Sequence, residues 1–402
     1  MSGERGFSLP ELLVAMAIMM MVVGSVFALL NPAQGSFATE PEIADLQQRL
    51  RVAQDTLYKD LVMAGAGAYL GEQTGSLLYY FPPVLPFRRG AIGDAPSASF
   101  ARPSVPGFPV DATDTITVIY VPSTTAQTTL AQPVTAGGAG AGMLLTVNGE
   151  TDCPRRADGS VQSLCGFSKG MTVLVFDNTG NHDAFTITGV SDATATIAVN
   201  RAPDAFETTY PVGSKVVEGV VRTYYLERDT LQLMSYDGST GPDVPVVDNV
   251  VDLSFEYWGD PNPPRRTTNP MTSDGPWMTY GPAPTGAENC LIALDQGEQV
   301  ERLPTLPSGS NPHALVKLTE EQLTDGSSGW CPTNTSSNRY SPNLFRIRRI
   351  VANVRVQAAL TSMRGPAGAL FRVGGTSRSA IRWISDQQVR FEVSPRNMNL
   401  GR

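Results

Sequence analysis

The chain has 402 residues, more than one typical domain, so it can bury a hydrophobic core of ample size. Its 38 glycines, 31 prolines and only 17% charged residues are typical of strand-rich and loop-rich proteins and argue against a helical bundle. The formal net charge of −8 argues against general binding to nucleic acids. We therefore expect a fold of the α+β class.

The first element along the chain is an apolar segment of bilayer length. Residues 9–30 contain a single charge, Glu11. A helix of this length spans about 33 Å, which is enough to cross a membrane. Arg5 precedes the segment and the next basic residue is Arg49, so the N-terminus should stay in the cytoplasm. A secretory signal usually has a shorter apolar core, whereas a plain single-pass anchor fits equally well.

The string Gly6-Phe7-Ser8-Leu9-Pro10-Glu11-Leu12 separates these alternatives. It resembles the class III leader of type IV prepilins and pseudopilins. The resemblance implies that a prepilin peptidase cuts between Gly6 and Phe7 and that Phe7 is then N-methylated. It also implies that Glu11, the fifth residue of the mature chain, lies near the N-terminal amine of a neighbouring subunit during assembly.

Glu11 also has a local role open to it. Ser8 lies three residues before Glu11, which is the spacing of a capping box, and Pro10 is tolerated in a first turn. A carboxylate at the centre of the hydrocarbon costs on the order of 2.5–3.5 kcal/mol, so a cationic partner such as the amine of Phe7 is expected. The two roles are compatible. In the family that the leader resembles, proline at the position of Pro10 is common among minor pilins and pseudopilins, which argues against the main filament subunit.

A second helix is predicted after a break. Asn31-Pro32 and residues 34–38 should interrupt or loosen the first helix, and Thr39 with Glu42 repeats the capping-box spacing. Gly65 and Gly67 should end the second helix. Its apolar residues recur every three or four positions and predict a face that packs on a β-sheet: Ile43, Leu46, Leu50, Ala53, Leu57, Leu61 and Ala64.

The end of this helix carries a second resemblance. Residues 50–65 are similar to the helix end of PilW-type minor pilins, which in turn resemble the J-type minor pseudopilins of type II secretion. The likeness lies mainly in Arg51, Asp60, Ala64 and Gly65. From the residues themselves, Lys59 and Asp60 are interpreted as solvated helix charges and Gly65 as the C-terminal stop.

From residue 115 the hydrophobic pattern changes to a period of two, which predicts strands. The expected strands are 115–121, 143–147, 171–176, 185–190, 194–199, 220–226, 231–236, 252–257, 347–360 and 389–393. Several of them should form a small barrel or sandwich inserted in the head. Residues 259–342 are rich in Pro, Gly, Ser, Asn and Thr and are interpreted as a surface insertion with one helical turn near 319–323.

These elements divide the chain into a leader, a helix in two parts and a head. We expect a leader at 1–6, a transmembrane and filament-core helix at 7–30, a periplasmic amphipathic helix at 31–67 and a β-rich head at 68–402. Within the head we expect a β-subdomain at 137–213 and the loop-rich insertion at 259–342.

Four cysteines, Cys153, Cys165, Cys290 and Cys331, suit disulfide bonding in an exported chain, and three pairings are open. The local pairs Cys153–Cys165 and Cys290–Cys331 are the simplest, and a loop of the first size contributes about 3 kcal/mol in the chain-entropy model. Zinc is the rival interpretation, but neither pair has the C-x-x-C spacing and no histidine lies beside them.

Catalytic and cofactor motifs are weak throughout. Asp177, Asn178, Asn181 and Asp183 form an oxygen-rich turn that is a weak calcium candidate, although hairpin turns favour the same residues. His182 and His313 lack a nucleophile context, and each is expected to be a satisfied or an exposed surface histidine. The glycine-rich run 137–142 lacks the lysine of a phosphate loop and is expected to be a linker. We therefore expect no cofactor, no metal and no enzyme.

Charge is distributed unevenly along the chain. Residues 346–402 contain eleven arginines and no lysine against only Asp386 and Glu392. We expect a solvated basic face that complements acidic surface in the head or in a neighbour. A DNA-contacting patch is the sharper alternative, but the arginines are not interleaved with stacking aromatic residues.

The resemblance implies a minor, PilW-like pilin, with a long N-terminal helix packed on a large antiparallel β-rich head. Its function would be in pilus assembly initiation or in the tip complex. Expected partners are the prepilin peptidase, other minor pilins, the major pilin and a tip adhesin. The chain would start in the inner membrane, with a cytoplasmic N-terminus and a periplasmic head, and move to the extracellular tip. The alternatives are a J-type minor pseudopilin, or a tip module that binds DNA or a surface ligand.

Overall fold

The structure, a computed structural model, describes residues 8–67, 76–88, 115–137, 142–150, 153, 157–159, 162–201, 208–238, 242–264, 286, 288–311, 314–324, 329–331, 340–378 and 380–399, with the backbone alone at 28–38, 136, 208 and 381. The chain divides into two compact units. The first comprises Met1–Arg51 and Arg355–Gln388, and the second comprises Val52–Val354 and Val389–Arg402.

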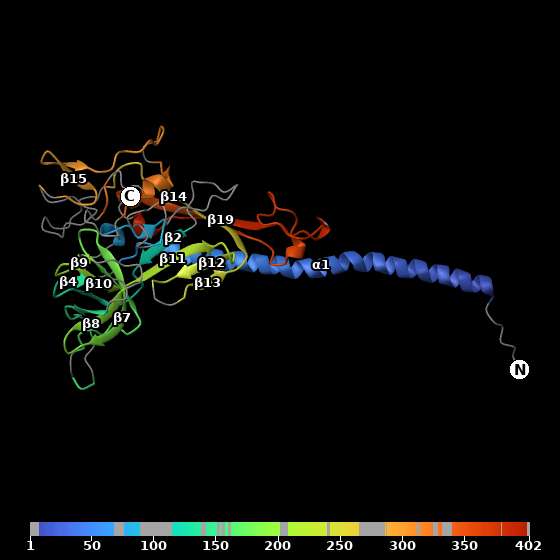
Figure 1. Cartoon of the computed structure of the whole chain (residues 1–402), viewed down its shortest axis with the longest axis horizontal. Helices are drawn as coiled ribbons and strands as arrows, with labels where there is room; N and C mark the ends of the chain where they lie inside the picture. The colour runs from blue at the N-terminus through green and yellow to red at the C-terminus, as the bar shows by residue number, and fades with distance from the viewer. Residues whose placement is uncertain are drawn as a thin grey trace. The chain divides into compact units, whose positions relative to one another are not determined.

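Helix α1, Leu9–Met63, is one uninterrupted helix of 55 residues. It is the blue coiled ribbon of Figure 1. The predicted break at Asn31-Pro32 and the separate start at Thr39 are therefore wrong. A proline inside a helix removes one hydrogen bond and costs about 3 kcal/mol, but it does not have to end the helix. Strong helical patterns on both sides of Pro32 extend the helix through it.

A five-stranded antiparallel sheet receives the end of α1. Its strands lie in the order β1-β2-β11-β12-β13. Their bounds are β1 Val84–Leu85, β2 Thr115–Tyr120, β11 Val220–Glu227, β12 Gln232–Tyr236 and β13 Val244–Val247. The predicted hairpin of residues 220–236 is confirmed, because β11 pairs with β12 from Thr223 opposite Tyr236 to Glu227 opposite Gln232.

A six-stranded sheet, in the order β3-β10-β6-β7-β8-β5, has its own hydrophobic core. Its two outer strands are joined, since Leu130 bridges Val147 and the N–H of Ala131 donates to the carbonyl of Thr146 over 2.9 Å. The sheet therefore closes into a small barrel, one of the two forms that the alternating pattern predicts. The bounds are β3 Gln127–Thr129, β5 Gly142–Thr146, β6 Thr172–Phe176, β7 His182–Ser191, β8 Thr196–Arg201 and β10 Lys215–Glu218. A short ribbon accompanies it, made of β4 Val134–Ala136 and β9 Thr208–Tyr210.

A four-stranded sheet, in the order β17-β14-β18-β19, contains the last predicted strands. Its members are β14 Val250–Gly259, β17 Val316–Leu318, β18 Ile347–Val356 and β19 Gln387–Val393. In β14 the alternating residues Leu253, Phe255 and Tyr257 are buried, as their pattern predicts.

The predicted insertion at 259–342 is more than a surface loop. β17 comes from this region and pairs with β14, so part of the insertion completes a sheet. The other elements here are the hairpin β15 Ile292–Asp295 with β16 Glu298–Glu301 and the short helix α3 Glu320–Thr324, which confirms the predicted helical turn. Short 3-10 helices complete the described fold: η2 Leu77–Tyr79, η3 Pro342–Arg346, η4 Thr361–Met363, η5 Ala380–Arg382 and η6 Arg396–Met398.

Candidate functional site

The N-terminal half of α1 is an uncovered apolar rod. Leu9–Phe27 has a mean hydropathy of 2.1, is long enough to cross a membrane, and has none of its surface buried. Side chains such as Leu9, Met21 and Phe27 are more than two-thirds exposed. So much continuous apolar surface is unfavourable in water and calls for lipid or for neighbouring subunits.

Glu11 makes local hydrogen bonds at the start of this rod. Its Oε2 accepts from the backbone N–H of Ser8 over 2.9 Å and from the Ser8 hydroxyl over 2.8 Å. This is the carboxylate half of the capping box that the spacing predicts. Gly6 and Phe7 lie outside the described residues, so the processing site and the part of Glu11 in assembly stay predictions.

The C-terminal half of α1 is covered on one face. Of the predicted apolar stripe, Ile43 and Leu50 are half-buried, and the remaining five residues are fully buried: Leu46, Ala53, Leu57, Leu61 and Ala64. The prediction of a packing face is thus confirmed.

Asp60 lies at the centre of this docking contact. Its carboxylate accepts hydrogen bonds from the hydroxyl of Tyr120 on β2 over 3.0 Å and of Tyr224 on β11 over 2.7 Å. The Nε of Arg222 lies 4.0 Å from the same carboxylate. Asp60 is buried, so the interpretation of it as a solvated helix charge is wrong. Sequence periodicity missed this because Asp60 lies beside the apolar stripe, and its partners come from strands far along the chain.

The pKa values of the two tyrosine hydroxyls are raised in this environment. Burial, and then the negative charge of Asp60, raise the pKa of Tyr120 to about 12. The same two causes raise the pKa of Tyr224. Both phenols therefore stay protonated at neutral pH and act as donors to the carboxylate.

Gly65 ends α1, as predicted. Its φ of 78° is in the left-handed region that favours glycine, and its N–H donates to the carbonyl of Ile119 on β2 over 3.0 Å. A Cβ at this place would lie 3.1 Å from Cγ of Pro83 and 3.3 Å from Cγ of Met398. The glycine thus joins the helix end closely to the head.

The four cysteines are paired locally in the structure. Disulfide bonds join Cys153 to Cys165 and Cys290 to Cys331, with Cα–Cα distances of 5.5 Å and 5.3 Å. Each bond closes a loop of the head, in unit 2.

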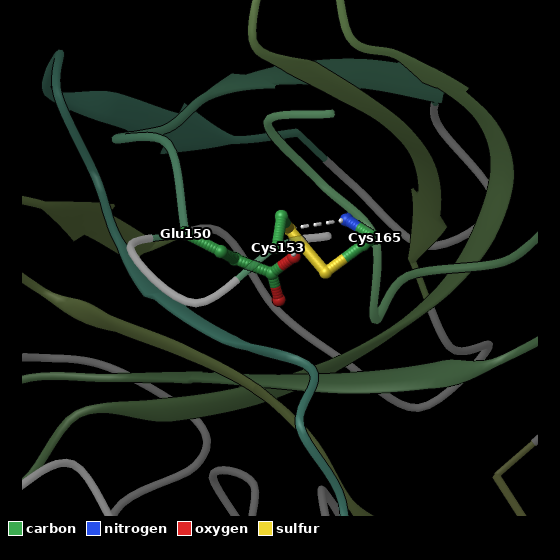
Figure 2. Close-up of side chains that lie close together, drawn as sticks. All are labelled: Glu150, Cys153 and Cys165. Atoms are coloured by element: carbon green, nitrogen blue, oxygen red, sulfur yellow. Dashed lines mark hydrogen bonds between the residues drawn. A yellow bond between two sulfur atoms is a disulfide. The ribbon is translucent and has the colours of Figure 1, made fainter. Parts of the chain in front are cut away.

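Glu150 lies beside the first disulfide (Figure 2). Its Oε2 is 3.1 Å from Sγ of Cys153 and accepts from the N–H of Gly166 over 3.0 Å. The pKa of Glu150 is raised chiefly by burial. The three side chains are close enough to enclose a metal ion, but the sulfurs are bonded to each other and the carboxylate is engaged with backbone N–H groups. The arrangement is that of a stapled loop.

The candidate calcium ligands in the β6–β7 turn accept hydrogen bonds from the protein itself. The Oδ1 of Asp177 accepts from the backbone N–H of Thr179 and of Asn181, over 2.8 Å and 3.1 Å. Asn181 Nδ2 donates to Oδ2 of Asp177 over 3.0 Å. Asp183 instead forms a fully buried ion pair with Arg201 at 2.8 Å and accepts from the hydroxyl of Tyr210. These contacts stabilise a hairpin turn and the barrel interior.

His182, expected to be a satisfied or an exposed surface histidine, is buried. Its ring stacks on Phe81, with ring centroids 4.1 Å apart. The exposed alternative is therefore wrong, because β7 begins at this residue and turns its side chain inward, whereas the satisfied alternative agrees with the contact of Nδ1 with the carbonyl oxygen of Gly180 at 3.2 Å. His313 lies outside the described residues.

The arginine-rich C-terminal region is divided between the interior and the surface, and the predicted solvated basic face is wrong only for its buried arginines, since Arg378, Arg382, Arg390 and Arg396 are exposed. Arg346, Arg348 and Arg364 are buried. Arg346 donates to Asn343 Oδ1 over 2.9 Å and to the carbonyl of Pro261 over 2.8 Å. The three buried arginines cross-link the interior and are not available to a DNA-contacting patch.

Comparisons with known proteins single out the apolar rod. Residues 1–27 match the family model described as the prokaryotic N-terminal methylation motif. A comparison of the sequence with curated proteins gives no match. The methylation motif implies processing by a prepilin peptidase and assembly with other pilins, and it suggests a structural role rather than an enzymatic one. A methylation motif on an uncovered apolar helix, which fits membrane anchoring by the N-terminus, supports a type IV pilin-like protein.

Proposed function

We propose that this chain is a minor pilin of the PilW type, which contributes to the initiation of pilus assembly or to the pilus tip complex. The observation that carries the proposal is one continuous helix with an uncovered apolar half, which bears the methylation motif, and a second half docked on a β-sheet. The first half suits packing among other helices. The second half connects this segment to a large head.

In this proposal the prepilin peptidase cuts between Gly6 and Phe7, and Phe7 is N-methylated. Glu11 then exchanges its bonds to Ser8 for the N-terminal amine of a neighbouring subunit. The exchange costs little, because both present bonds come from one adjacent, exposed residue. Other minor pilins, the major pilin and a tip adhesin are the proposed partners.

Three measurements test the proposal. Mass spectrometry of the chain from its native host should give a mature N-terminus at N-methylated Phe7, whereas an intact Met1 would rule out processing. Deletion of the gene should reduce the number of surface pili, and the tagged chain should co-purify with minor pilins. Normal piliation together with a loss of protein secretion would instead indicate a J-type pseudopilin.

A further inference from the structure

The C-terminal lobe, residues 355–388, belongs with the membrane-proximal part of the chain. It forms one compact unit with residues 1–51. Oε1 of Glu42 on α1 accepts hydrogen bonds from the N–H groups of Ala359 and Leu360. Figure 1 shows the lobe in red beside the blue ribbon of α1. The lobe is therefore attached to the helix that carries the candidate membrane span.

The lobe has an ordered interior of its own. Phe371 and Trp383 pack edge to face with ring centroids 5.6 Å apart. Oδ2 of Asp386 accepts from Nε of Arg355 over 3.0 Å and from the N–H of Arg372 over 2.7 Å. Its surface residues are thus presented by a folded unit.

Three large apolar side chains stay outside this interior. Leu360, Leu370 and Val373 are exposed by 50%, 57% and 39%. These side chains are accessible for an apolar contact.

The outward charge of the lobe is positive. Residues 355–388 contain five arginines and one acidic residue, Asp386, which is paired with Arg355. Arg364 is buried and donates to Gln357 over 2.6 Å. Arg378 and Arg382 are exposed, and neither has an ion-pair partner among the described residues. This sign is opposite to the net charge of the whole chain, −8.

Helix geometry sets the height of the lobe above a membrane. The apolar segment ends at Leu30, and Glu42 lies 12 residues further along the same helix, which is about 18 Å. A compact lobe of this length is about 20 Å across, so it extends about 10 Å from the level of Glu42 toward the bilayer. The headgroup layer covers about 5–8 Å of the remaining distance.

We propose that the C-terminal lobe docks on the anionic headgroup surface of the membrane in which α1 is anchored. Arg378 and Arg382 attract the lipid phosphates, and Leu360, Leu370 and Val373 enter the interface. A charge close to an anionic membrane surface contributes enough to favour the docked state about fivefold for each arginine.

The test uses the full-length chain reconstituted in vesicles of phosphatidylcholine alone or mixed with phosphatidylglycerol. Phospholipids brominated at a shallow position of the acyl chain quench the fluorescence of tryptophans at the membrane interface, and the Trp383→Phe variant supplies the background from the other tryptophans. Both leaflets have the same composition, so chains of either orientation report alike. We expect quenching of Trp383 in anionic vesicles and little in neutral ones, with a decrease at high salt.

The double variant Arg378→Gln/Arg382→Gln should lower the docked-to-undocked ratio by about 25-fold, and Leu370→Ser should lower it further. Leu144→Ser on β5 is the matched control, because Leu144 is 63% exposed and lies in the other unit, and it should change nothing. Equal quenching in neutral and anionic vesicles would overturn the proposal. Quenching that survives the double variant would also overturn it. So would quenching of Trp383 that occurs only where cross-linking detects a second copy of the chain.

Discussion

The two halves of α1 each contain an acidic residue, and the two residues have opposite environments. Glu11, in the uncovered half, is exposed and accepts hydrogen bonds from Ser8, three residues away. Asp60, in the docked half, is buried and bonds to tyrosines 60 and 164 residues away. A locally satisfied carboxylate can change partners without disturbing the head. A carboxylate satisfied by two strands cannot, because its loss leaves buried donors unpaired.

The largest expected effect comes from removing the buried carboxylate. Asp60→Ala leaves the hydroxyls of Tyr120 and Tyr224 without their acceptor and should lower the free energy of unfolding by about 2–4 kcal/mol. Denaturant unfolding of the full chain in detergent measures it. The control is Asp55→Ala, an exposed acidic residue on the same helix, which should change the value by less than about 0.5 kcal/mol. Equal effects would mean that Asp60 does not hold the helix to the sheet.

Alkaline pH should weaken the same contact. The pKa of Tyr120 is raised to about 12 in the folded chain, whereas an unfolded tyrosine titrates near about 10. The folded state keeps its proton longer, so this contribution is complete below about pH 10 and is lost as pH rises through about 12. The unfolding midpoint measured against pH should fall less steeply in Tyr120→Phe. The same slope in both chains would contradict the assignment.

A smaller effect is expected where the lobe meets the first half of the chain. Glu42→Ala removes the acceptor of the Ala359 and Leu360 N–H groups, so these two amides should exchange hydrogen about tenfold faster. Exposed Glu40 supplies the matched variant Glu40→Ala, for which we expect unchanged exchange. Slow hydrogen exchange of these amides in both variants would mean that Glu42 does not attach the lobe to α1.

The smallest effect on stability belongs to the uncovered half. Glu11→Ala and Ser8→Ala should each leave the free energy of unfolding of the head within about 0.5 kcal/mol of the parent, since both residues are exposed and bond to each other. Incorporation into sheared pili, measured by immunoblotting, should fall sharply for Glu11→Ala only. An equal fall for Ser8→Ala would show that capping, and not subunit registration, is the task of Glu11.

Local patterns predicted most of the elements. The alternating apolar residues located β2, β6, β7, β11, β12, β14 and β19 to within a few residues, because a half-buried strand shows its period in any context. Short strands such as β1, β3 and β13 were missed, since two to four residues do not establish a period. The prediction of a helix break at Pro32 was wrong because proline weakens a helix by an amount that neighbouring turns can offset.

By itself, the sequence determined that the chain begins with a bilayer-length apolar helix carrying a pilin-like motif, and that the same helix later presents an apolar stripe to a β-rich head. Both features are contained in runs of neighbouring residues. Only the tertiary structure decided that Asp60 is a buried acceptor, that His182 and Arg346 are interior residues, and that a lobe of residues 355–388 joins the first part of the chain. Each depends on partners distant in sequence, and the burial of a polar side chain depends on whether such partners meet it.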